Sequence, residues 1–364
     1  MPITLDILNT YYMMGLWEGL SPVNTFFRDR YFPTEAGDIY AADKVLAEYQ
    51  DGDHGMAPFM VERADPIAVA RQGYEIHDYA PTCIKQSRPL TLDDLKKRGF
   101  GEAILSDSTE AERATRLVMG DLALLERRFT RTEELLCAQT MINNGFTVNE
   151  MIDANTVGNV ATVQYYDANK GNDGIYTVAV GDQWATNSSW STIVATVRNI
   201  CRALSRRGLP HSDLIVGQAV ADILLANTDF RSLVDRNSGI VIASPIVQQL
   251  TQYDGVSLLG IVNFGGYTLN VIVVDEQYKA LDGTYTNYFP AKSIMVTAPG
   301  CGHLMYAHIT HIDEQGEYTT IKGKRVPDLF VDRKRKSREL ILESRPLAAP
   351  KNYSPWVYAA NVVA

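Results

Sequence analysis

The longest regular pattern of apolar positions runs from about residue 109 to residue 144. Apolar side chains recur there at helical intervals, which is the periodicity of a helix with one buried face. They are Val118, Leu122, Leu125, Phe129 and Leu136. Thr109 and Glu112 have the spacing of a capping box, and Asn144 with Gly145 favours a left-handed ending. The pattern predicts a helix over residues 109–144, about 50 Å long at 1.5 Å per residue.

A second region, residues 195–298, mixes helical and strand patterns. Helical spacing predicts one helix around residues 194–204, which ends at Gly208 and Pro210, and another over residues 217–227. Runs of β-branched residues predict strands at residues 240–242, 258–262 and 269–274. Gly265 and Gly266 separate the last two of these strands and favour a hairpin turn. The region is therefore predicted to be one mixed α/β domain.

Residues 45–92 have an irregular, extended pattern interrupted by several prolines. The segment is too rich in Tyr, Ile and Val to be simply disordered, so a long projecting β-hairpin is expected. A second hairpin is predicted over residues 155–182, around the turn-forming residues 169–174. Residues 356–363 are so apolar that they should form a docked strand.

The N-terminal region resembles an arm. Residues 4–20 have amphipathic helical spacing, and residues 26–33 form a dense aromatic and basic cluster that ends in Pro33. Such a cluster is expected to bury its rings on a partner surface.

Composition excludes several classes of protein. The chain has 364 residues, of which 46% are hydrophobic and 21% charged, values typical of a folded globular protein. It contains no apolar run of about 18 residues or more that could span a bilayer. Its net charge of −9 disfavours binding to nucleic acids and anionic membranes by the molecule as a whole. Four separated cysteines and no secretory signal favour synthesis in a reducing cytosol.

One cluster has the residue types of a metal site. Cys301, His303, His308 and His311 lie close together in the sequence, and thiolate and imidazole groups suit zinc. On an extended strand, however, His303 and His311 share one face while His308 points to the other. We therefore expect these histidines to be solvated or to lie in an interface, and we favour this over a zinc site in a metal-dependent enzyme.

Other signs of catalysis are lacking in the sequence. It contains neither a phosphate-binding glycine loop nor a G-x-S-x-G nucleophile elbow. Adjacent acids such as Glu133 and Glu134 are expected to be solvated on a helix face. We therefore expect no enzymatic activity.

Two basic patches could contact phosphates. Residues 333–338 form one patch, and Arg127, Arg128 and Arg131 form another on the predicted long helix. Neither patch has the interleaved aromatic residues that single-strand binding requires. Only weak, non-specific contact with DNA is expected, and solvated or subunit-facing arginines are the alternative.

The predicted parts together indicate an assembly protein. An arm and a projecting hairpin that cannot bury their apolar residues at home would bury them on neighbours, through heterologous contacts that close into rings or shells.

Short segments, in their order along the chain, resemble the lambda-type major capsid proteins of tailed phages, the phage capsid protein E family. They are residues 25–28 with Phe32 and Pro33, residues 79–81 with Ile84, Lys85, Pro89 and Leu90, Trp184, Gly283 before residues 288–290, and Ser344 with Pro346 and Leu347. The resemblance covers most of the chain. The strand 271–274 lacks the tyrosine often found near its end in the family, although Tyr278 is kept.

The resemblance implies an α+β protein with the Hong Kong 97 phage capsid fold. Its parts would be an N-terminal arm (1–44), an extended loop (45–92), a peripheral domain (93–194) with a spine helix (109–144), an axial domain (195–298), and a return to the peripheral domain (299–364). It also implies self-assembly into hexamers and pentamers of an icosahedral head that encloses double-stranded DNA, with no catalysis and no cofactor.

The resemblance further implies partners and a location. The partners would be copies of the chain, a separate scaffolding protein, a portal and a decoration protein. No interaction with a membrane is expected. The chain would reside in the virion after assembly in the host bacterial cytoplasm. Assembly contacts are expected at Phe26, Phe27, Arg28, Tyr31, Phe32, Arg63, Tyr74 and Lys85. The alternatives are an encapsulin-like shell around protein cargo and, third, a metal-dependent enzyme that uses the Cys301 to His311 cluster.

Overall fold

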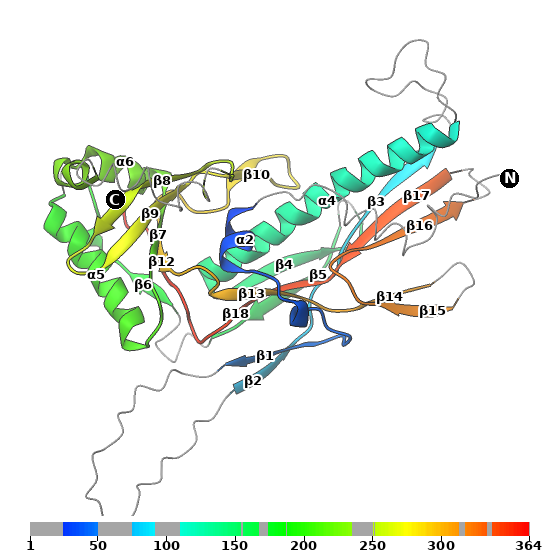
Figure 1. Ribbon diagram of the computed structural model, residues 1–364, viewed down its shortest axis with the longest axis horizontal. Helices are drawn as coiled ribbons and strands as arrows, with labels where there is room; N and C mark the ends of the chain where they lie inside the picture. The colour runs from blue at the N-terminus through cyan, green and yellow to red at the C-terminus, as the bar shows by residue number, and fades with distance from the viewer. Residues whose placement is uncertain are drawn as a thin grey trace, which may run out of the picture.

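The computed structural model describes residues 25–49, 75–91, 110–153, 156–166, 174–186, 188–234, 250, 252–312, 317–332 and 337–363. Figure 1 shows an elongated molecule with a helix-covered sheet at one end and a long helix above smaller sheets at the other. Several sequence-based expectations lie outside the described residues. They are the amphipathic segment 4–20, most of the extended loop with Arg63 and Tyr74, the strand 240–242 and the basic residues 333–336.

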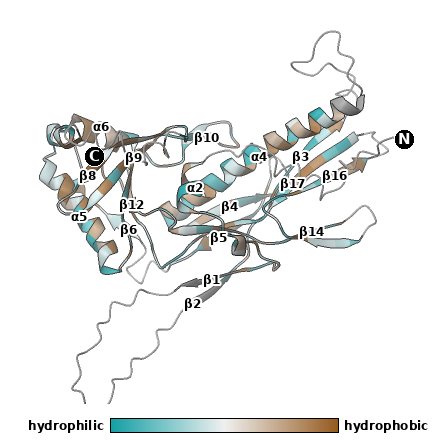
Figure 2. Cartoon of the chain, in the orientation of Figure 1, coloured by the Kyte–Doolittle hydropathy of each residue, from teal (hydrophilic) through white to brown (hydrophobic). Residues whose placement is uncertain are grey.

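The long helix α4 spans Glu110–Asn143 and confirms the predicted helix. Figure 2 shows hydrophobic and hydrophilic bands that alternate along it. The helix ends as expected, because Asn144 adopts a left-handed φ of 53°. A Cβ on the next residue, Gly145, would lie 2.1 Å from the Val163 carbonyl oxygen, so only glycine fits where the chain leaves the helix.

The buried face of α4 packs on a three-stranded antiparallel sheet. The strand order is β16 (Val326–Asp332), β17 (Ser337–Ser344) and β3 (Ile84–Thr91). The core between helix and sheet contains Val118, Leu122, Leu125 and Phe129 of α4 with Leu90, Leu329, Leu340 and Leu342 of the strands. The apolar stripe that predicted the helix is therefore its buried face.

Five antiparallel strand pairs surround this body. They are β1 (Val45–Tyr49) with β2 (Glu75–Tyr79), β4 (Gly145–Met151) with β5 (Val157–Gln164), β13 (Gly302–Tyr306) with β18 (Pro346–Pro350), β14 (Ile309–Ile312) with β15 (Tyr318–Ile321), and β10 (Gln277–Lys279) with β11 (Tyr285–Asn287). The pair β1 and β2 is the base of the predicted projecting hairpin. Short helices are α2 (Phe26–Tyr31) and the 3₁₀ turns η2 (Ala36–Asp38) and η4 (Val180–Asp182).

The other end of the molecule is a six-stranded mixed sheet. Its order is β6 (Ile175–Thr177), β19 (Val357–Ala360), β12 (Ile294–Thr297), β7 (Asp213–Gly217), β9 (Thr268–Val274) and β8 (Val256–Asn263). The pairs β19 with β6 and β7 with β9 are parallel, and the others are antiparallel. The predicted hairpin turn between β8 and β9 is confirmed, since Gly265 and Gly266 both have positive φ, 66° and 110°.

The central strand β7 of this sheet is buried on both faces. Helices α5 (Trp190–Arg206) and α6 (Gln218–Ala226), which confirm two further predictions, pack against Leu214 and Val216 of β7. The alternate residue, Ile215, points into a second core shared with α2, α4, β13 and β18. Because successive strand residues face opposite sides, one strand joins the two halves of the molecule.

The structure differs from the sequence-based topology in three places. The turn-like residues 169–174 do not join a hairpin, because β5 pairs with β4 whereas β6 pairs with β19. Strand β3, assigned to the extended loop 45–92, pairs with β17. The tail 299–364 was expected to return to the peripheral domain, yet its strand β19 lies inside the six-stranded sheet. The partners of β3, β6 and β19 are distant in sequence, where local patterns carry no information, whereas β4, the partner of β5, directly precedes it.

Candidate functional site

The aromatic cluster of the arm lies inside the chain's own core. Phe26, Phe27, Tyr31 and Phe32 have at most 1% of their surface exposed. Phe26 and Phe27 pack edge to face at 5.2 Å between ring centroids. Gly302 makes room for Phe32, since an added Cβ there would lie 2.3 Å from the ring. These rings need no neighbouring subunit to bury them, and their contact with one stays a prediction.

Glu134 of α4 holds the N-terminal end of α2. Its two carboxylate oxygens accept hydrogen bonds from the backbone N–H groups of Phe27, at 2.6 Å, and Arg28, at 2.8 Å. Such N–H groups lack partners within a helix, so a carboxylate satisfies them well. Burial raises the pKa of Glu134 to about 8, although the two N–H donors favour the charged form.

Glu133, the adjacent residue, forms a fully buried ion pair with Arg325. The guanidinium donates from Nη1 to Oε1 at 2.5 Å and from Nη2 to Oε2 at 2.9 Å, a bidentate arrangement. Tyr306 donates a further hydrogen bond to Oε1 at 2.9 Å. Burial alone would raise the pKa of Glu133, but the charge of Arg325 outweighs it and lowers the pKa.

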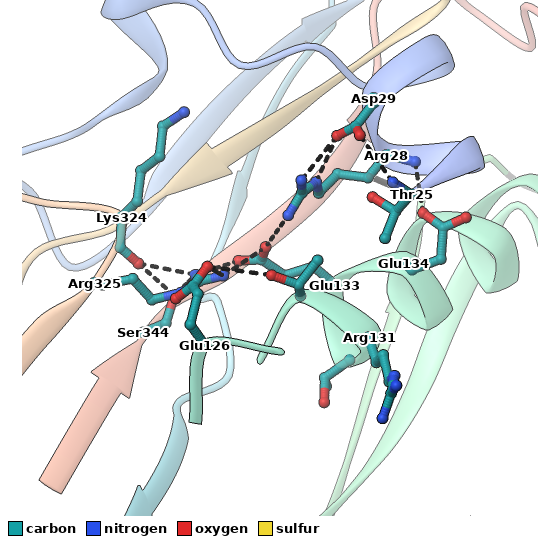
Figure 3. A network of polar contacts seen from close by, with 12 residues as sticks. Thr25, Arg28, Asp29, Glu126, Arg131, Glu133, Glu134, Lys324, Arg325 and Ser344 are labelled. Carbon is teal, nitrogen blue, oxygen red and sulfur yellow. Dashed lines mark hydrogen bonds and ion pairs between the residues drawn. The ribbon is translucent and has the colours of Figure 1, made fainter. Parts of the chain in front are cut away.

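The same network includes further groups from both ends of the chain (Figure 3). Arg325 also donates from Nε to Glu126 at 2.8 Å and from Nη1 to the Ser344 hydroxyl at 3.1 Å. The guanidinium of Arg28 lies between two carboxylates. Its Nη2 is 2.8 Å from Oδ1 of Asp29, and its Nη1 is 3.5 Å from Oε2 of Glu133. Burial opposes the charge of Arg28, yet the carboxylates of Asp29 and Glu133 outweigh it and raise its pKa. The network thus fixes the arm on the long helix.

A second polar contact fixes the arm on the six-stranded sheet. Asp213, at the start of β7 and fully buried, accepts from Arg30 Nε at 2.8 Å and from the Tyr31 hydroxyl at 3.1 Å. Its other oxygen accepts from Asn270 at 2.9 Å. Burial, and after it the charge of Asp213, raises the pKa of Tyr31. One short helix is therefore bound to both halves of the molecule.

The remaining expected contact residues do not join this junction. Lys85 lies on β3, is mostly exposed, and pairs with Glu343 of β17 at 2.5 Å. The structure thus brings together five of the eight residues, those of the arm, and places Lys85 elsewhere. Arg63 and Tyr74 lie outside the described residues.

Sequence reasoning missed the acids that hold the arm. It expected Glu133 and Glu134 to be solvated, but the structure buries both completely. A signal was present, because Glu133 follows Phe129 by four residues and precedes Leu136 by three, so it lies within the apolar stripe. Nothing local identified Arg325 or Asp213, whose partners lie far away in the sequence.

The Cys301 to His311 cluster does not come together as a metal site. His303 belongs to β13 and His311 to β14, and these strands pair with different partners. Cys301 is buried, and burial raises the pKa of its thiol to about 12. Among the residues that the structure describes, no three His, Cys, Asp or Glu side chains are grouped to hold a metal ion.

Comparison with known proteins identifies the family. A model of phage major capsid protein E matches residues 9–361. The chain belongs to the phage major capsid protein E family. It is a phage capsid protein with the α+β fold of Hong Kong 97-like capsids, and its place is the capsid of the virion. No curated protein matches the chain.

Solved structures similar to this capsid protein come from phages and prophages. A prophage protein of Escherichia coli CFT073, assigned as a capsid protein, has a TM-score of 0.61 at 16% identity, and the match covers 98% of this chain and 99% of the other. A phage-related protein from Bordetella bronchiseptica RB50 has a TM-score of 0.49 at 10% identity, with 97% of each chain covered. A chain of the satellite phage P4 procapsid, which includes the size determination protein, has a TM-score of 0.44 at 11% identity, covering 96% and 98%. The first of these likenesses supports the fold.

Two further findings concern this capsid protein as a whole. All four cysteines are free thiols, and three of them are buried. In the described part of the chain, no helix combines the length and the apolar character needed to cross a membrane.

Proposed function

We propose that this chain is the building block of the icosahedral head of a tailed phage, in which hexamers and pentamers of it enclose packaged double-stranded DNA. The observation that carries the proposal is the family match over residues 9–361. A match of that extent covers the arm, the long helix and the sheet together, and self-assembly into a shell follows from the family. The comparisons give no support to a cargo-holding compartment or a metal-dependent enzyme.

The architecture supports different roles for two parts of the subunit in the shell. The six-stranded sheet with α5 and α6 would be the axial domain, which meets its neighbours around the capsomer centre. Strands β1 and β2 are paired from Val45 with Tyr79 to Tyr49 with Glu75, so the two ends that residues 50–74 connect lie side by side. We place this segment, with Arg63 and Tyr74, over a neighbouring subunit. Each contact would be modest and multiplied by valency.

The role is one of assembly, without catalysis or cofactor. Arg28 and Lys85 keep exposed surface beside their ion pairs, so both can also contact a neighbour. A separate scaffolding protein, a portal and a decoration protein complete the set of partners that we propose. The three buried thiols fit assembly in the reducing host cytoplasm, before the particle is released.

Electron microscopy of the expressed protein tests the proposal. The chain would be produced alone and with its neighbouring scaffolding gene, and each sample would be sedimented and imaged in negative stain. We expect shells, tubes or capsomer rings in at least one sample. A uniform small oligomer under every condition would contradict the proposal.

A further inference from the structure

One face of α4 carries a stripe of unusual composition. Arg116, Gly120, Arg127 and Arg131 lie within about 60° of the helix circumference, at about 100° per residue. All four are exposed. Arg128 is also exposed and flanks the stripe. We call these residues the arginine stripe.

Within the described residues, the arginines of the stripe form no ion pair, although the charge of Arg131 acts on the carboxyl group of Glu276. Asp121 pairs with Arg88 at 2.8 Å, and Glu126 and Glu133 pair with Arg325. Glu134 is occupied by α2. Across the part of the chain that the structure describes, no carboxylate lies within 4.0 Å of a guanidinium of the stripe. In Figure 3 the side chain of Arg131 points away from the buried network. In a chain of net charge −9, these arginines therefore stay outside the ion pairs that the described residues form.

Gly120 is a second, independent observation on the same face. Glycine in a helix interior is unfavourable relative to alanine, because its backbone loses more conformational freedom on folding. Here the chain itself does not require it, since a Cβ on Gly120 would meet no atom within 4 Å. The missing side chain of Gly120 is not needed for packing within the chain. It lets another molecule come close to the helix backbone at this position.

The length and surface of the stripe define the occupant. Arg116 and Arg131 are fifteen residues apart, about 22 Å along the axis at 1.5 Å per residue. That spread suits an extended polyanion better than a small anion, and guanidinium groups suit phosphates in particular. A protein partner would bring an apolar contact core. No large apolar side chain on the described part of α4 is among the exposed ones.

We propose that the arginine stripe faces the lumen of the head and contacts the phosphate backbone of packaged double-stranded DNA without regard to sequence. This inference rests on the proposed function, because only a head filled with DNA supplies that polyanion. It assigns the inner surface of the subunit to the exposed face of α4. The contacts per subunit are few, so the genome stays mobile enough to be packaged and released.

A matched pair of double variants tests the contact. Arg127→Gln with Arg131→Gln removes two charges from the stripe, and Arg202→Gln with Arg206→Gln removes two exposed arginines from α5. Binding of the unassembled protein to a labelled DNA duplex would be measured by fluorescence anisotropy over a range of salt concentrations. We expect the slope of log K against log salt to fall by about 2 for the stripe variant. The α5 variant should keep the wild-type slope. Equal slopes for all three proteins would overturn the inference.

Labelling of assembled shells tests the orientation. Arg127→Cys would be made in a Cys83→Ser background, because Cys83 is the exposed native thiol. A polyethylene glycol maleimide too large to enter should react only after the shells are disrupted. Reaction with intact shells would overturn the inference while leaving the proposed function standing, whereas failure to form any shell would count against the proposed function itself. If the stripe variant lowers shell yield in the absence of DNA, the occupant is a protein and the inference is wrong.

Discussion

At the scale of single residues, the arm is bound by a few side chains that have no accessible surface. Phe27 packs against Phe26, Tyr31 and Phe289, and its own N–H donates to Glu134. The cluster that looked in sequence like a sticky external patch is therefore part of the core. A substitution there acts on folding before it acts on assembly.

Phe27→Ala is expected to lower the free energy of unfolding by about 3–5 kcal/mol, because it removes a buried ring and leaves a cavity. Urea unfolding of the unassembled subunit measures this. Leu281→Ala is the control, since Leu281 is 96% exposed and should change little. An unchanged midpoint for Phe27→Ala would show that the ring is not buried in this chain.

The ion pair of Glu133 and Arg325 gives a prediction that depends on pH. Arg325→Met removes the bidentate partner of the buried Glu133 carboxylate and leaves only Arg28 near it, at 3.5 Å, which should cost about 3–5 kcal/mol near neutral pH. In the wild type the pKa of Glu133 is lowered, so its contribution to stability is present above the ordinary carboxyl pKa and is lost as the pH falls. In the variant burial dominates and the sign reverses, so stability falls as the pH rises.

The difference in unfolding free energy between the two proteins should therefore shrink from pH 8 towards pH 4.5, as followed by urea unfolding at each pH. Adding Glu133→Gln to Arg325→Met should recover much of the loss at neutral pH, because the orphaned charge is gone. A deficit that is the same at every pH would mean that Glu133 carries no charge in the wild type.

At the scale of elements, the end of α4 is determined by backbone geometry. Gly145 has φ near 157°, within the range where a side chain is unfavourable, and a Cβ would collide with the Val163 carbonyl oxygen. Gly120 lies in the same helix with open space around it. The two glycines make a matched pair.

Gly145→Ala should destabilise the subunit by roughly 2 kcal/mol or more, because β4 must shift away from β5 to relieve the collision. Gly120→Ala should instead stabilise it by about 0.5–1 kcal/mol through helix propensity. Thermal unfolding of both variants beside the wild type checks the opposite signs. Two shifts of the same sign would contradict the account of Gly145.

Most elements whose partners are near in sequence could be predicted, with the pair of β4 and β5 as an exception, and most of those whose partners are distant could not. The stripe of α4, the spacing in α5 and α6 and the turn between β8 and β9 are all written in consecutive residues. The pairing of β3 with β17, and of β19 with β12, depends on which surfaces meet after collapse. The candidate site follows the same rule, since the aromatic cluster was visible in the sequence but its anchors Glu134 and Asp213 were not.

At the scale of the whole molecule, the tail joins both cores. Trp356 is buried in the core shared with α2 and α4, and its indole N–H donates to Asn144 at 3.1 Å. The neighbouring Val357 and Val362 are buried under α5 and α6. Strand β19, which begins at Val357, lies between β6 and β12 in the six-stranded sheet.

Removal of residues 351–364 should therefore abolish the cooperative unfolding transition of the entire subunit, because it opens two strand edges and uncovers two cores. Circular dichroism during heating measures the transition. Lys351→Ala is the control, since its ion pair is with an exposed carboxylate, that of Glu35, and such surface pairs contribute little to stability. A truncated protein that unfolds at the wild-type temperature would contradict the central role of β19.

The position of β19 also sets an order of events during synthesis. It leaves the ribosome after every other strand of the sheet that it completes, although it occupies an interior place there. Earlier strands can pair with one another, but the gap between β6 and β12 stays open until residues 357–360 emerge. Translation proceeds at about 5–20 residues per second, slowly enough for partly made domains to expose sticky surface. The six-stranded sheet of a nascent subunit is therefore incomplete until nearly the whole chain has left the ribosome.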